Sequence, residues 1–117
     1  MRIYTDYLQD IIDSCKLIKQ FIKGINHEQF LKDLKTQYAV VRALSVIGEA
    51  VKKIPNSIKT KYTNIPWKEM AGMRDILIHD YFGTDIEVLW QTVKKDIPFI
   101  HKEFKKIIKD TKKQSNI

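Results

Sequence analysis

Apolar residues recur every three or four positions along most of this chain, and that spacing restricts what it can fold into. Tyr4, Leu8, Ile11 and Cys15 begin one such series, and similar series follow in the middle of the chain and towards its end. Amphipathic helices have this period, whereas half-buried strands alternate at every second residue. No alternating run bounded by turn residues is present, and the chain has only 4 Gly and 3 Pro. The sequence therefore predicts an all-α protein.

These apolar series predict an antiparallel bundle of the four-helix type with one or two additional short helices. The main helices are expected at about residues 4–24, 35–53, 66–82 and 84–108, and the short ones after Asn26 and at 57–62. The 35–53 series has two adjacent apolar faces, which indicates a central helix or one buried in a dimer. Residues 1–108 are thus expected to form one helical domain, and residues 109–117 a basic tail that frays.

Local signals indicate where these helices begin or break. Asn26 with Gln29, and Thr84 with Glu87, have the spacing of capping boxes, in which each residue's side chain bonds the other's backbone N–H. Pro98 falls inside the last apolar series. Because proline lacks the N–H that would bond the preceding helical turn, we expect a kink or brief break near residue 96.

Length and charge limit the kind of protein this can be. A chain of 117 residues with 44% hydrophobic content forms a single domain. The net charge of +7 favours polyanionic partners such as RNA. The N-terminus has no basic region followed by an apolar one, and no apolar run approaches the length of a membrane span. We therefore expect a soluble, cytoplasmic protein without a membrane partner.

Few residues offer metal or cofactor chemistry. The single Cys15 excludes an internal disulfide and a cysteine-based zinc site, and its place in an apolar series predicts a buried thiol. His27, His79 and His101 show no metal-ligand spacing with acidic residues, and no glycine-rich phosphate loop is present. The expectation is an enzyme or binding module with no metal and no cofactor.

One stretch, residues 65–83, contains charges inside an apolar helical pattern. Arg74 occupies a position where a leucine would be expected, and Asp75 lies one helical turn before His79. On an ideal helix Arg74 and His79 point about 140° apart. A compact Arg/His site therefore needs either a distorted helix end or a second copy of the helix across a two-fold axis, which the small Gly72 would allow to approach. The residues alone leave both arrangements open.

The same stretch resembles a known family. Residues 74–81 form an Arg-x4-His-x-Tyr string, and they resemble the signature of HEPN domains of the HepT-like toxin group. The likeness extends to Ile65-Pro66-Trp67 before the string, to the segment around Trp90 after it and to residues 47–52 upstream. It covers the chain from about Tyr4 to Phe104.

The resemblance implies an activity and a set of site residues. HEPN proteins with this signature are similar in being ribonucleases whose Arg and His are catalytic, which assigns those roles to Arg74 and His79. Asp75 matches the polar position after the Arg and would support them. Tyr81 matches the tyrosine that a partner nucleotidyltransferase antitoxin of the MNT type modifies with AMP in type VII toxin–antitoxin systems.

Several of these residues have simpler interpretations. Without the resemblance, His79 could cap a helix end, Arg74 could pair with Asp75 or Glu49, and Tyr81 could pack at the helix end. Glu49 is expected either to be exposed or to pair with Arg42 or Arg74 beside the site. The lysines near the C-terminus could contact RNA phosphates or form a solvated helix face.

Arg and His suffice chemically for metal-free RNA cleavage. A neutral imidazole can accept the proton of a ribose 2′-hydroxyl, and a guanidinium can hold the phosphate and its developing charge. Together with this chemistry, the resemblance implies a homodimeric, metal-independent endoribonuclease toxin acting on tRNA or mRNA. The alternative is a non-catalytic helical module that binds nucleotide or RNA as the partner of an MNT-type nucleotidyltransferase.

Overall fold

The structure is a computed structural model that describes residues 2–72 and 86–115 of the chain. Every regular element within these residues is helical, which confirms the predicted all-α fold for this part of the chain. Helix 67–72 continues to the end of the first described range. The other elements are α1 (Tyr4–Phe21), α2 (His27–Lys32), α3 (Leu34–Lys52), α4 (Asn56–Lys61), α6 (Ile86–Gln91), the π-helix η2 (Thr92–Asp96) and α7 (Ile97–Ser115).

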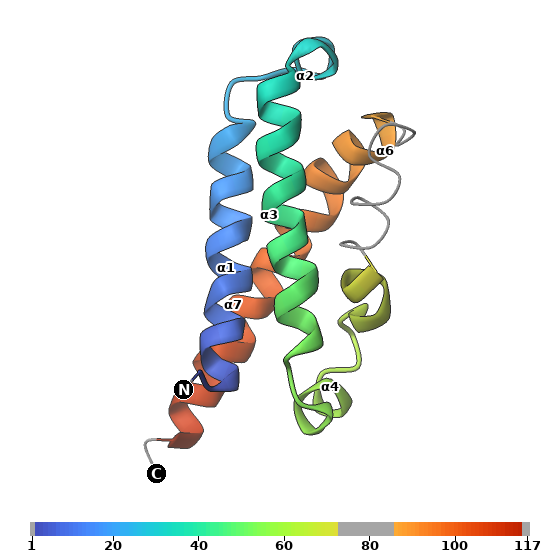
Figure 1. Cartoon of the computed structure of the whole chain (residues 1–117). Helices are drawn as coiled ribbons and strands as arrows, with labels where there is room; N and C mark the ends of the chain where they lie inside the picture. The colour runs from blue at the N-terminus through green and yellow to red at the C-terminus, as the bar shows by residue number, and fades with distance from the viewer. Residues whose placement is uncertain (1, 73–85, 116–117) are drawn as a thin grey trace.

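Helices α1 and α3 form an antiparallel hairpin that α2 closes at one end (Figure 1). The chain leaves α1 through Gly24, whose φ of 75° lies in the left-handed region that favours glycine. The predicted capping box at α2 is confirmed, because the side chains of Asn26 and Gln29 each accept a 2.9 Å bond from the other's backbone N–H. Asp33 then caps α3 by accepting from the backbone N–H of Thr36 at 3.0 Å.

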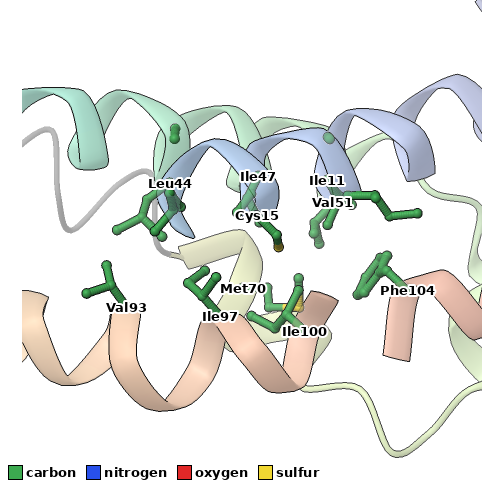
Figure 2. Packing of buried hydrophobic residues seen from close by; sticks show 14 of the residues in the cluster. Ile11, Cys15, Leu44, Ile47, Val51, Met70, Val93, Ile97, Ile100 and Phe104 are labelled. Carbon is green, nitrogen blue, oxygen red and sulfur yellow. The ribbon is translucent and has the colours of Figure 1, made fainter. Parts of the chain in front are cut away.

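Helix α7 packs across α1, and a single apolar core fills the space between α1, α3 and α7. Figure 2 shows side chains of α1 and α3 facing those of α7, with Met70 of helix 67–72 between them. The core therefore ties the start of the predicted site helix to the three long helices. Its largest fully buried members on the long helices and helix 67–72 include Leu8, Ile11, Ile18, Leu44, Ile47, Met70, Ile97, Ile100 and Phe104.

The α-helix expected for the last apolar series is interrupted, as the position of Pro98 predicts. Residues 92–96 form a π-helix in which the Ile97 N–H donates to the carbonyl of Thr92, five residues back. Pro98 has no N–H for the Lys94 carbonyl, so the α-helical ladder cannot continue unchanged through this turn. The expected break is confirmed as a π-helical segment between α6 and α7.

Two helix boundaries differ from the sequence prediction. Helix α7 continues to Ser115, where a frayed tail was expected after residue 108. Thr111 is buried and donates from its hydroxyl to the Ile107 carbonyl, while Asp110 accepts a hydrogen bond from the Tyr62 hydroxyl at 3.2 Å. The contact with Tyr62 and the burial of Thr111 stabilise a segment whose composition alone suggests fraying. Helix 67–72 begins one residue after Pro66, which had been expected at the first helical position.

Within the described ranges, no helix is both long enough and apolar enough to cross a membrane.

Candidate functional site

The four residues of the predicted site, Arg74, Asp75, His79 and Tyr81, lie outside the described residues, as does Thr84 of the second capping box. The structure describes the chain on both sides of this segment, together with Glu49 on α3. The contacts of these two flanks fix the points on the bundle at residues 72 and 86, between which the predicted site lies in the sequence.

The flank before the segment is held by Trp67 and Met70. The Trp67 indole Nε1–H donates to the Tyr62 carbonyl at 2.9 Å, and its ring meets Phe104 of α7 edge-on with centroids 5.5 Å apart. Met70 is fully buried in the core. These contacts fix helix 67–72 against α7 immediately before the Arg-x4-His-x-Tyr string.

The flank after the segment is held by aromatic and charged contacts between α6 and α2. The Trp90 ring lies 5.1 Å from Phe30 and 5.9 Å from His27, measured between centroids. Glu87 pairs with His27 and also accepts from Gln91. Those two hydrogen bonds lower the pKa of the Glu87 carboxyl, so it is ionised at neutral pH.

Glu49 is half-buried on α3, between the buried residues Gly48 and Ala50. The structure therefore does not place it on the exposed face of the helix, which was one of the two alternatives. Arg42, one of its two candidate partners, is exposed. The other, Arg74, lies outside the described residues, so a supporting role for Glu49 remains a prediction.

Other reactive groups are not arranged for chemistry in the described part of the chain. Cys15 is fully buried as expected, and burial raises the pKa of its thiol to about 12, so it is not a thiolate nucleophile at neutral pH. No group of three or more His, Cys, Asp or Glu among the residues in ranges 2–72 and 86–115 could hold a metal ion.

One polar pair was not anticipated from the sequence. Lys19 of α1 and His101 of α7 meet with 2.6 Å between Nζ and Nδ1, although 82 residues separate them. His101 is buried, and that burial together with the Lys19 charge lowers the pKa of its imidazole. The available signal was the position of His101 inside the apolar series of the last helix, which marks it as inward-facing but does not reveal its partner.

A family model described as ribonuclease HepT-like matches residues 11–107. This span includes both anchored flanks, Glu49 and the whole Arg-x4-His-x-Tyr string. The chain belongs to the ribonuclease HepT-like family. The resemblance inferred from the string is thereby confirmed, and the HepT-like domain covers all of the core helices except the ends of α1 and α7.

Curated relatives match over nearly their whole length. "Probable ribonuclease HepT" of Thermococcus cleftensis is 55% identical over 108 residues, which cover 92% of this chain and 98% of that protein. "Putative RNase MJ1216" of Methanocaldococcus jannaschii is 55% identical over 104 residues, covering 89% of this chain and 86% of the relative. "Putative RNase TTE0752" of Caldanaerobacter subterraneus is 43% identical over 112 residues and is covered completely. No solved structure gives a significant match.

Proposed function

We propose that this protein is a metal-independent endoribonuclease in which Arg74 and His79 are the catalytic residues. The observation that carries the proposal is the HepT-like family match, which runs through the Arg-x4-His-x-Tyr string and both flanks. The relatives named as ribonucleases support it, because they are of the same length and about half of their residues are identical to those of this chain.

In the proposed reaction the RNA supplies its own nucleophile. His79 accepts the proton of a ribose 2′-hydroxyl as that oxygen bonds the adjacent phosphorus, and the bond from phosphorus to the 5′-oxygen breaks. A protonated imidazole gives a proton to the departing 5′-oxygen, leaving a 2′,3′-cyclic phosphate. Arg74 holds the phosphate and the charge that develops on it. DNA would not be cut, because it lacks the 2′-hydroxyl.

Two copies of the chain would complete this site. Arg74 and His79 diverge by about 140° on one ideal helix, whereas two copies of the helix across a two-fold axis provide one His as base, one as acid and an Arg on each side. A Cβ built at Gly72 meets nothing within 4 Å among the described residues, so packing within this part of the chain does not require a glycine there. Close approach of a second chain would account for it.

Asp75 and Glu49 are proposed as supporting residues. Asp75 precedes His79 by one helical turn and would orient its imidazole and favour its protonated form. Glu49 is half-buried on α3 and would pair with Arg74, holding the guanidinium in one orientation. Both carboxylates would act through the catalytic residues and would not touch the RNA.

Tyr81 is proposed as the control point of a type VII toxin–antitoxin system. An antitoxin nucleotidyltransferase of the MNT type would transfer AMP to its hydroxyl. Because Tyr81 lies two residues from His79, the added phosphate would exclude the RNA phosphate by its bulk and by its negative charge.

The test is to incubate purified wild type with a labelled single-stranded RNA in EDTA, beside His79→Ala and Arg74→Ala. A matched control is Arg2→Ala, which removes an exposed arginine near the N-terminus that takes no part in the proposed chemistry. We expect cleavage by the wild type and the control, with 2′,3′-cyclic phosphate or 3′-phosphate ends, and none by the two site variants. Full activity in either site variant would refute the assignment.

The oligomer and the modification can be tested separately. Sedimentation of the wild type should give twice the mass of the 117-residue chain. Absence of cleavage by protein whose Tyr81 is shown by mass spectrometry to be unmodified, across several RNAs including tRNA, would favour the alternative of a non-catalytic partner of a nucleotidyltransferase.

A further inference from the structure

A pocket of about 450 Å³ opens to solvent between the end of α1 and the junction of η2 with α7. Three lysines line it, Lys19 and Lys23 from the end of α1 and Lys94 from η2. Apolar side chains, among them Ile22 and Val93, form the rest of its wall together with Gly24 and Asn26, and none of its described lining residues is acidic. We call it the lysine pocket. Three cations around an open cavity form a field that attracts an anion.

One of the three lysines is held in place by a buried histidine. The Lys19 ammonium lies 2.6 Å from the Nδ1 atom of His101, and the histidine is 5% exposed. An ammonium can only donate, so Nδ1 accepts and the imidazole proton resides on Nε2. The pKa of His101 is lowered by burial and by the charges of Lys19, Lys105 and Lys16, which keeps the imidazole neutral and able to accept.

Burying this imidazole has a cost that a purely structural residue would avoid. Among the described residues the buried Nε2 atom finds no hydrogen-bond partner. An apolar side chain would fill the same place on α7 without leaving a buried donor unpaired. The histidine provides what an apolar residue cannot, namely an acceptor that fixes the Lys19 ammonium.

The third lysine owes its position to the π-helix. Residues 92–96 adopt this rare conformation because Pro98 interrupts the α-helical ladder, and π-helical turns are frequent at functional sites. Lys94 lies in this segment with its ammonium 5.4 Å from the centre of the Trp90 ring, a cation–π distance. The Trp90 ring and the π-helical turn together fix the position of the Lys94 ammonium.

Stabilisation of the α1 C-terminus explains only part of this arrangement. Lysines near the end of a helix interact favourably with its partial negative charge, and this accounts for Lys19 and Lys23. It does not account for Lys94, which comes from another element, or for the buried acceptor on His101.

We propose that the lysine pocket binds a backbone phosphate of single-stranded RNA outside the Arg74/His79 site, with His101 as the positioning residue for Lys19. The inference rests on the proposed function, since it assigns a second contact to the same substrate. Among the described residues no aromatic side chain lines the pocket to stack a base, so the pocket suits a phosphate of a strand better than a free nucleotide.

The test measures binding without cleavage. A fluorescein-labelled single-stranded 2′-O-methyl RNA has no free 2′-hydroxyl, so its fluorescence anisotropy reports binding even by an active nuclease. For the triple variant Lys19→Gln, Lys23→Gln, Lys94→Gln we expect affinity to fall about ten- to a hundredfold near 0.1 M salt. The slope of log K against log salt concentration should also become shallower, by about 0.7 for the loss of one phosphate contact to a single strand.

A control variant separates the pocket from net charge. Lys53, Lys109 and Lys113 are exposed lysines outside the pocket. Changing all three to Gln takes the net charge from +7 to +4, as the pocket variant does. We expect this control to bind within about threefold of the wild type. An equal loss of affinity in both triple variants, or no loss in the pocket variant, would overturn the proposal.

The positioning role of His101 has its own readout. His101→Leu should weaken RNA binding while circular dichroism shows an unchanged fold, and His101→Asn, whose amide oxygen can accept from Lys19, should restore the affinity. Failure of Asn to rescue would remove His101 from the proposal.

This test can fail independently of the nuclease proposal. If the wild type binds the modified RNA through the lysine pocket but cuts no RNA, the catalytic assignment fails and the pocket stands. If it cuts RNA and the pocket variants bind as tightly as the wild type, the pocket fails alone. Binding of ATP that depends on the three pocket lysines, with no binding of RNA, would reassign the pocket to a free nucleotide and overturn the inference.

Discussion

Phe104 gives the sharpest test of how the core anchors the site segment. Its side chain is fully buried on α7, and its ring meets Trp67 edge-on at 5.5 Å. Replacing a buried Phe by Ala removes its transfer free energy and leaves a cavity, which together cost about 3–5 kcal/mol. About 0.5–1.5 kcal/mol of this belongs to the aromatic pair. We therefore expect Phe104→Ala to lower the free energy of unfolding by about 3–5 kcal/mol.

Phe99 provides the matched control on the same helix. It is 42% exposed, so the same chemical change removes much less buried surface. We expect Phe99→Ala to change the free energy of unfolding by about 0.5 kcal/mol. The difference in the free energy of unfolding between the two variants measures the effect of burial, because both variants lose the same phenyl ring.

The assay is urea unfolding followed by far-UV circular dichroism and by tryptophan fluorescence, with both variants and the wild type at two protein concentrations. Two concentrations are needed because a dimer gains stability with concentration. A loss below about 1 kcal/mol for Phe104→Ala, or equal losses for the two variants, would refute the packing argument. A Phe99→Ala effect that depends on concentration would place Phe99 in an interface between copies.

Three further predictions follow from buried polar groups. Gln37→Leu should lower the free energy of unfolding by about 1–3 kcal/mol, because the buried Gln37 amide donates to the Phe30 carbonyl at 2.8 Å; thermal melts check this. Cys15 should resist iodoacetamide at pH 8 in the folded protein and react once urea unfolds it, since burial raises its pKa to about 12; mass spectrometry counts the adducts. Folded His101 has a pKa below the ordinary 6.5, so its stabilising contribution is complete above pH 6.5 and is lost as pH falls through the folded-state pKa. Urea unfolding across pH values should show this loss, and NMR titration should show a higher His101 pKa in Lys19→Met.

Local signals identified most of the helices. The apolar periodicity and the capping box at Asn26 and Gln29 placed α1, α2 and α3 close to their observed bounds, because both signals act within a few residues. Pro98 likewise predicted a break in the last helix, and the structure shows it as the π-helix η2. The family was evident from one ordered string, since a contiguous string can be recognised without knowledge of the fold.

The sequence was less informative where distant segments meet. It predicted a frayed tail, because the composition of residues 109–117 is basic and polar, yet Asp110 accepts a hydrogen bond from Tyr62 and Thr111 is buried. The catalytic roles of Arg74 and His79 remain predictions from the sequence and the family. Only the tertiary structure shows how the segments before and after them are anchored, through Trp67 and Trp90.

By itself, then, the sequence determined the helical class, the positions of α1, α2 and α3 and the family, because these depend on periodicity, caps and a contiguous string. Only the tertiary structure decided that Lys19 meets His101 across 82 residues and that Lys94 shares a pocket with Lys19 and Lys23. Such pairings depend on how α1 and α7 pack against each other, and no local pattern encodes the relative position of two helices that far apart in the chain.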